Sequence, residues 1–225
     1  MDNPVADSPL FRGLAPDQVQ SVRERLVRVG VTRGGALYRE DEPGDSLYVI
    51  ESGTVKLGRH ANDGRQHLLG IAGPSELIGE LCLFDPGLRT ATATALTETV
   101  AYRMAHDDLT RWLVTAPSIA EHLLRVLSRR LRRTHETLAG LIGLDASGRL
   151  AWTLLDLSQR FGAPTADGVR VDCSLTQQEL AQLVGAARET VNKVLADFVG
   201  SGWVRHEGRS VVLLDTDQLR HCFMR

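Results

Sequence analysis

The chain has 225 residues, of which 43% are hydrophobic and 24% are charged, and its formal net charge is −2. This composition excludes a wholly disordered chain, and the near-neutral charge gives no overall positive field for a nucleic acid or a membrane surface. The three cysteines, Cys82, Cys173 and Cys222, are too scattered for a disulfide framework or a Cys-x-x-Cys site. Because we find neither a signal-peptide pattern nor an apolar run of membrane length, we expect a cytoplasmic protein with no membrane partner.

The first part of the chain changes from a helical to a β pattern. Residues 8–29 carry apolar side chains at helical spacing, which predicts a helix there. From Gly30 onward the apolar runs are short, and turn signals such as Pro43-Gly44-Asp45 separate them at intervals of ~8–12 residues. This pattern predicts one small β domain, a sandwich or a barrel, over residues 30–105.

The segment Gly79–Thr92 interrupts the predicted strands with a short helix and a loop. Gly79 permits close approach of the backbone, and Arg89 can pair with a phosphate, to which the hydroxyl of Thr90 adds a donor. A phosphate would repel Glu80, so a sugar hydroxyl is the partner that suits this carboxylate. A single arginine suits a singly charged cyclic phosphodiester better than a triphosphate. The alternative is a purely structural ion pair between Glu80 and Arg89.

A long helix is predicted from Pro117 to about Ile142. About 25 helical residues span ~38 Å, which is long for a helix that lies on one small domain. Its apolar residues alternate spacings of three and four, so they form a seam suited to a second copy of the chain in a two-fold dimer. The alternative is a core helix within one large domain. The seam residues are Leu124, Leu127, Leu131, Thr134, Leu138 and Leu141.

A break at Asp145-Ala146-Ser147-Gly148 begins a second domain, and residues 149–161 predict another amphipathic helix. The pattern from Leu175 to Leu195 is that of a helix-turn-helix. Thr176 and Glu179 suit a capping box at the start of the first helix, and Gly185 suits the tight turn before a second helix that begins near Ala187.

This second helix carries residues suited to the edges of bases. Its early outward positions hold Arg188, Glu189, Asn192 and Lys193. Arginine pairs with guanine and glutamate accepts from cytosine, and the first turn of such a helix enters the major groove. Residues 203–214 predict a two-stranded wing in which Arg209 and Ser210 contact phosphates. The alternative is a protein-binding winged helix, since residues 146–225 hold nine Lys or Arg and nine Asp or Glu.

With its Arg-Glu-Thr-Val-Asn-Lys core, the run Leu175–Phe198 resembles the helix-turn-helix of the CRP/FNR family of bacterial transcription regulators, in particular the cyclic-AMP receptor protein type. The resemblance covers nearly the whole chain and implies an α+β fold. Its expected parts are a cyclic-nucleotide-binding, jelly-roll-like β-roll over residues 1–116, a dimerisation helix over 117–144 and a winged helix-turn-helix over 145–225. The implied partners are double-stranded DNA with TGTGA-type half-sites, a second copy of the chain and RNA polymerase. The DNA-binding candidates are Thr176, Gln177, Ala187, Arg188, Glu189, Thr190, Asn192, Lys193, Arg209 and Ser210.

The segment that begins at Gly79 resembles the phosphate-binding cassette of cyclic-nucleotide-binding domains. The resemblance implies cAMP as the effector, with cGMP or another cyclic nucleotide as the alternative. Two residues depart from the family pattern: Cys82 stands where Ser, Gly or Ala is usual, and His135 stands where Ser or Asn is usual. Cys82 is either a buried thiol or a redox-sensitive one, and His135 either alters base choice or only lies in the seam. The nucleotide-binding candidates are Gly79, Glu80, Leu81, Cys82, Arg89, Thr90, Arg130, Thr134 and His135.

The leading hypothesis is a homodimeric DNA-binding transcription regulator under allosteric control by a cyclic nucleotide. One alternative is a constitutive regulator, or one with another effector, whose cassette is vestigial. The other is a cyclic-nucleotide-binding module that docks a protein. We do not expect an enzyme or a metal site, because the sequence contains no nucleophile–base pair, P-loop or metal-ligand spacing.

Overall fold

The computed structural model describes residues 20, 24–60, 66–115, 117–172, 174–208 and 210–223. The chain divides into two compact units, Met1–Arg132 and Arg133–Arg225. The first unit contains strands β1 (Val27–Val31), β2 (Ala36–Tyr38), β3 (Ser46–Ser52), β4 (Val55–His60), β5 (Gln66–Ala72), β6 (Leu77–Ile78), β7 (Thr92–Ala95) and β8 (Thr99–Ala105), with helices α3 (Leu81–Phe84) and α4 (His106–Thr115). Helix α5 (Pro117–Gly143) begins in this unit and continues into the next.

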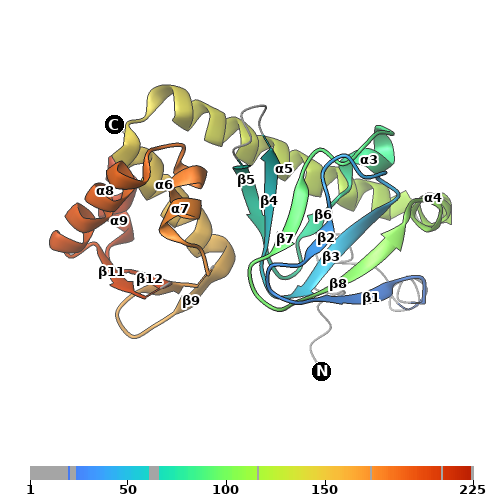
Figure 1. Cartoon of the computed structure of the whole chain (residues 1–225), viewed down its shortest axis with the longest axis horizontal. Helices are drawn as coiled ribbons and strands as arrows, with labels where there is room; N and C mark the ends of the chain where they lie inside the picture. The colour runs from blue at the N-terminus through green and yellow to red at the C-terminus, as the bar shows by residue number, and fades with distance from the viewer. Residues whose placement is uncertain are drawn as a thin grey trace. The chain divides into compact units, whose positions relative to one another are not determined.

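The strands of the first unit form two antiparallel sheets of four strands, in the orders β1-β8-β3-β6 and β2-β7-β4-β5 (Figure 1). Strand β3 is buried along most of its length because its alternate residues face two cores. Tyr48 and Ile50 pack with residues of both sheets, whereas Leu47 and Val49 pack against α4 and the first turns of α5. The predicted β domain is therefore confirmed.

The predicted helix over residues 8–29 lies mostly outside the described residues, but its end is wrong. Val27 begins β1 and pairs with Arg103 of β8. The pairing of β1 with β8 outweighs the few apolar residues at helical spacing that predicted a helix at this end. Strand β6 and helix α4 have no counterpart among the predicted elements.

The second unit holds the end of α5 and a smaller mixed structure. Its further elements are α6 (Ala146–Phe161), β9 (Gly162–Pro164), β10 (Val169–Val171), α7 (Gln177–Val184), α8 (Arg188–Gly200), β11 (Val204–Glu207), β12 (Ser210–Leu213) and α9 (Thr216–Phe223). The strands form one antiparallel sheet in the order β11-β12-β10-β9. Helix α6 packs against α7, α8 and α9, so its buried leucines form the centre of the unit. The predicted helix-turn-helix and wing are confirmed, whereas β9 falls in a stretch for which no strand was predicted.

Candidate functional site

The candidate nucleotide site begins where β6 ends. Gly79 has φ +78, a left-handed conformation that L side chains rarely adopt. A Cβ at this position would lie 2.7 Å from Nη1 of Arg89 and 3.3 Å from the carbonyl oxygen of Ser46. Glycine is required here because the backbone turns directly against the Arg89 guanidinium.

Arg89 is buried although it is charged, and its side chain is 2% exposed. Its Nη1 donates to the carbonyl of Gly79 at 2.8 Å, and Nη2 donates to the carbonyl of Ser46 at 2.7 Å and to its hydroxyl at 3.3 Å. The guanidinium carbon lies 4.4 Å from the centre of the Tyr38 ring. A buried charge must be compensated in this way, and these contacts hold the cation between β2, β3 and the cassette.

Glu80 is 1% exposed and pairs through Oε1 with Arg130 of α5. The ion pair between Glu80 and Arg89, the alternative to a ligand site, is absent from the contacts of the described residues. Within that part of the chain, neither Oε2 of Glu80 nor Nε of Arg89 has a hydrogen-bond partner. A buried acceptor and a buried cationic donor without partners suit a ligand that offers a hydroxyl and an anionic oxygen.

The other cassette candidates divide into buried and exposed residues. Cys82 is buried, and its thiol donates to the carbonyl of Leu88 at a sulfur–oxygen distance of 3.3 Å. A Cβ at Gly44 would lie 2.1 Å from Cβ of Cys82, so the thiol packs closely against the loop before β3. Leu81 and Thr90 are exposed. The interpretation of Cys82 as a buried thiol is confirmed.

Three residues of this site were not identified from the sequence. Ser46 is fully buried and accepts from both Arg89 and Arg103. The Ser46 hydroxyl, then Arg103, hold the pKa of Asp45 below its ordinary value. Tyr38 supplies the ring beneath Arg89. The contacts that Arg89 and Arg103 make with Ser46, and that Arg89 makes with Tyr38, join residues more than 40 positions apart, for which the sequence offers no local signal.

The candidate DNA site is built by two well-defined helix ends. The side chain of Thr176 accepts from the backbone N–H of Glu179, whose carboxylate accepts in return from the N–H of Thr176. Gly185 ends α7 in a left-handed conformation with φ +67. The predicted capping box and turn glycine are thus confirmed, and Ala187 occupies the N-cap position of α8.

Most of the predicted DNA-contacting residues are exposed. Arg188 approaches Gln177 through a 3.4 Å contact between Nη2 and Oε1. Two positions differ from expectation: Asn192 is half-buried with its Oδ1 unpartnered in the described part of the chain, and Ser210 is buried and accepts from Arg170 at 3.2 Å. Arg209 lies outside the described residues. The exposed candidates are Thr176, Gln177, Ala187, Arg188, Glu189, Thr190 and Lys193.

Two family models match the two halves of the chain. The model described as a cyclic nucleotide-binding domain matches residues 28–115, and the Crp-like helix-turn-helix domain matches residues 148–222. A CRP-like cAMP-activated global transcriptional regulator from Mycobacterium tuberculosis is 51% identical over 97% of this chain and 98% of its own. The chain belongs to the CRP/FNR family of transcription regulators.

Further relatives in this family extend the similarity. A cyclic AMP receptor protein from Thermus thermophilus is 34% identical over 88% of each chain. Among solved structures, the c-di-GMP-responsive global regulator CLP of Xanthomonas campestris superposes with a TM-score of 0.75, at 27% identity, covering 88% of this chain and 99% of that one. The resemblance stated from the sequence is confirmed: the chain is a CRP-like DNA-binding regulator with a cyclic-nucleotide-binding domain.

In this family member, most seam leucines of helix α5 are exposed, whereas Leu127 packs partly against the core of the first unit. Leu124, Leu131 and Leu138 are 63%, 57% and 54% exposed in the single chain. Thr134, which lies in the seam, and His135, which follows it, are also exposed. Exposed leucines at this spacing form an apolar stripe along a helix.

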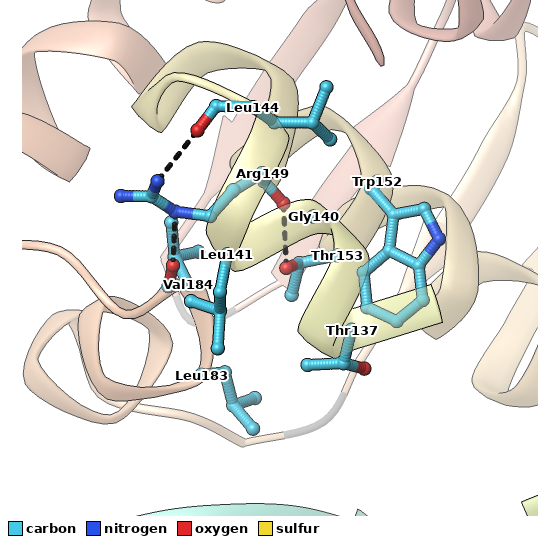
Figure 2. Close-up of a pocket in the computed structure, with 9 residues that line it drawn as sticks. All are labelled: Thr137, Gly140, Leu141, Leu144, Arg149, Trp152, Thr153, Leu183 and Val184. Carbon is cyan, nitrogen blue, oxygen red and sulfur yellow. Dashed lines mark hydrogen bonds between the residues drawn. The ribbon is translucent and has the colours of Figure 1, made fainter. Parts of the chain in front are cut away.

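The end of α5 is joined to the helix-turn-helix by one arginine. Arg149 of α6 donates through Nη1 to the carbonyl of Leu144 at 2.8 Å and through Nε to that of Val184 at 2.9 Å (Figure 2). Its Nη2 also reaches the carbonyl of Gly185 at 3.3 Å. A Cβ at Gly185 would lie 2.7 Å from Cδ2 of Leu141. The last turn of α5 therefore contacts the turn of the helix-turn-helix directly.

Metal clusters and membrane-spanning helices are both absent from the described residues. No group of three or more His, Cys, Asp or Glu side chains is placed to hold a metal ion. None of the helices in that part of the chain is long and apolar enough to cross a membrane.

Proposed function

We propose that this chain is a homodimeric, cytoplasmic transcription regulator whose affinity for a palindromic TGTGA-type operator is controlled by cAMP. The observation that carries the proposal is the pair of buried, unpartnered atoms in the cassette, Oε2 of Glu80 and Nε of Arg89. Leaving such groups unsatisfied costs ~1–3 kcal/mol each, and more for charged groups. A cyclic nucleotide satisfies both, because its ribose hydroxyl donates to the carboxylate and its phosphodiester accepts from the guanidinium.

The charge of the site favours a cyclic monophosphate over a nucleoside triphosphate. Arg89 is a single buried cation, and the buried carboxylate of Glu80 stands beside it. A ligand with one negative charge balances Arg89 without forcing Glu80 against a second anionic oxygen. Arg130 pairs with Glu80, and we assign it a further basic contact near the phosphate in the nucleotide complex.

We propose cAMP because two relatives are named for it. Two residues that differ from the family pattern are a reason to test other nucleotides as well. The M. tuberculosis and T. thermophilus relatives are named for cAMP, whereas the X. campestris regulator is named for c-di-GMP. Cys82 and His135 depart from the usual family residues. We assign Leu81, Cys82 and Thr90 to the cassette wall, and Thr134 and His135 to the base.

The proposed dimer forms through residues 117–144. The exposed seam leucines of α5 are the surface that a second copy of α5 covers in a parallel pair. The boundaries that we propose, 1–116, 117–144 and 145–225, place this helix between the two family domains. A two-fold axis sets the two copies of α8 about 34 Å apart, which requires half-sites ~10 bp apart.

Coupling between nucleotide binding and DNA binding requires only that the nucleotide bind the DNA-competent arrangement of the chain more tightly than the other arrangement. A differential of about 1–3 kcal/mol gives about 5- to 150-fold control of operator affinity. The contact of Leu141 with Gly185 and the hydrogen bonds of Arg149 support a route from the end of α5 to α8. We further propose RNA polymerase as the partner of the DNA-bound dimer.

Isothermal titration of the purified chain with cAMP, cGMP and c-di-GMP tests the effector assignment. We expect saturable heat with cAMP, weaker binding of the other two, and loss of cAMP binding in Arg89→Gln. Arg220→Gln, an exposed change in α9, is the matched control and should bind as wild type does. Operator binding without heat from any nucleotide would favour the constitutive alternative, and nucleotide binding without operator binding would favour the protein-docking module.

A further inference from the structure

Tyr38 lies beneath the cassette and contacts its central cation. The tyrosine is the last residue of β2 and is 8% exposed. The guanidinium carbon of Arg89 is 4.4 Å from the centre of its ring, within the range of a cation–π contact. A Cβ at Gly79 would approach Cε1 of Tyr38 to 3.3 Å, so the ring also supports the turn that begins the cassette.

The ring contact and two sets of hydrogen bonds restrain the Arg89 guanidinium, and they leave one of its nitrogens without a hydrogen-bond partner among the described residues. Nη1 is held by Gly79, and Nη2 is held by Ser46. With the guanidinium carbon over the Tyr38 ring, Nε is the nitrogen without a hydrogen-bond partner among the described residues. A guanidinium held on one face and at two nitrogens cannot rotate freely, so its remaining donor keeps one direction.

The ring itself is fixed and electrically suited to this contact. Tyr48 lies 5.7 Å away between ring centres, tilted by 33°, and packs in the same core cluster. Burial, and then the nearby Glu80 carboxylate, raise the pKa of Tyr38, so its ring stays in the neutral form. The aromatic face is therefore the group that Tyr38 presents to Arg89.

We propose that Tyr38 is a positioning residue for nucleotide binding: its aromatic face orients the Arg89 guanidinium so that Nε meets the phosphodiester. This inference deepens the proposed function and rests on it for the ligand. It assigns to β2, outside the cassette, a contribution to phosphate affinity that depends on π-electron density rather than on the hydroxyl or on volume alone.

The test places phenylalanine, leucine or pentafluorophenylalanine at position 38. The cAMP dissociation constant is measured by calorimetry, and the Nε–Hε NMR signal of Arg89 is followed in the ligand-free protein. The signal is assigned by its loss in Arg89→Lys. Pentafluorophenylalanine at position 48 is the matched control, because Tyr48 shares the core and does not contact Arg89. Thermal melting of each variant verifies that the fold is retained.

We expect Tyr38→Phe to bind cAMP within about twofold of wild type, and the fluorinated ring at 38 to weaken binding about 5- to 30-fold. The control at 48 should stay within about twofold, and Tyr38→Leu should match or exceed the loss with the fluorinated ring. Equal affinities for phenylalanine and its fluorinated form at 38 would overturn the proposal. If the wild type binds no nucleotide, the proposed function fails. The NMR signal then tests the orientation of Arg89 alone: broadening confined to the fluorinated ring at 38 supports a Tyr38 ring that holds the guanidinium, and an unchanged signal overturns that role.

Discussion

The Nε of Arg149 donates a hydrogen bond to the backbone carbonyl of Val184, 2.9 Å away, and so joins the start of α6 to the end of α7. The same guanidinium satisfies carbonyls at Leu144 and Gly185. Free carbonyls at two helix ends are thereby satisfied by one side chain (Figure 2). Arg149 is thus the polar centre of the junction between α5 and the helix-turn-helix.

Replacing Arg149 with methionine should destabilise the second unit by about 1.5–3 kcal/mol, because hydrogen bonds from a charged donor are lost while the carbonyls remain partly buried. Urea denaturation followed by circular dichroism measures this change. Arg220→Met, which removes an exposed arginine paired with Asp217, should change stability by less than about 0.5 kcal/mol. Equal losses in the two variants would contradict the role given to Arg149.

Comparing Gly185 with Gly202 distinguishes the cost of a strained backbone from the cost of a steric contact. Both have positive φ, +67 and +74, but an added Cβ meets Leu141 only at Gly185 and meets nothing within 4 Å at Gly202. We expect Gly202→Ala to cost about 1 kcal/mol and Gly185→Ala clearly more, since α5 must move away from the turn. Denaturation midpoints of the two variants give the comparison. A smaller cost at Gly185 would mean that the contact with α5 is not restrictive.

Glu80→Gln should weaken cAMP binding at least ~10-fold, because the neutral amide is a poorer acceptor for the ribose hydroxyl and no longer pairs with Arg130. The matched change is Glu98→Gln at an exposed position outside the cassette, which should leave the affinity unchanged. Calorimetric titration of both variants measures the effect. An undiminished affinity in Glu80→Gln would remove the carboxylate from the site.

The sequence predicts what is local and misses what joins distant residues. The capping box of Thr176 and Glu179 and the turn at Gly185 depend on neighbours within a few positions, so both could be identified in advance. Tyr38 and Ser46 became site residues only because β2, β3 and the cassette meet in the fold. Ser210 was assigned from its place in the wing, yet the pairing of β11 with β12 and the contact with Arg170 turn its side chain inward.

The partners of Glu80 and Arg89 are a second case in which contacts between distant residues could not be predicted from the sequence. Their residue types and spacing suggested either a ligand site or an ion pair with each other. The carboxylate instead pairs with Arg130, 50 positions away, while Arg89 is held by backbone carbonyls. Only the three-dimensional arrangement leaves one atom of each residue unpartnered, and this distinction could not be made from spacing.

Acid should destabilise the first unit partly through Asp45. Its folded pKa lies below the ordinary value of 3.8, so its contribution is complete above that pH and is lost as the pH falls through the lower folded value. Asp45→Asn removes the contribution, so wild type should be the more stable protein above pH 4, and the two should converge below it. Urea midpoints measured between pH 2 and 6 test this, and parallel curves would contradict it.

Arg188→Ala should weaken specific operator binding by about 1–3 kcal/mol and relax the preference at the guanine that we propose as its partner. Mobility-shift titrations on operators with single base changes measure both effects. Arg220→Ala provides the comparison on an arginine of α9. Retention of full affinity and preference in Arg188→Ala would show that α8 does not enter the groove with its first turn.

The central claim is that a cyclic nucleotide controls how this chain binds DNA. It is tested most directly by titrating a TGTGA-N6-TCACA duplex with the protein at one fixed salt concentration, with and without cAMP. We expect cAMP to tighten binding by about 5- to 150-fold in wild type and to have no effect in Arg89→Gln. Identical affinities with and without cAMP in wild type would contradict it.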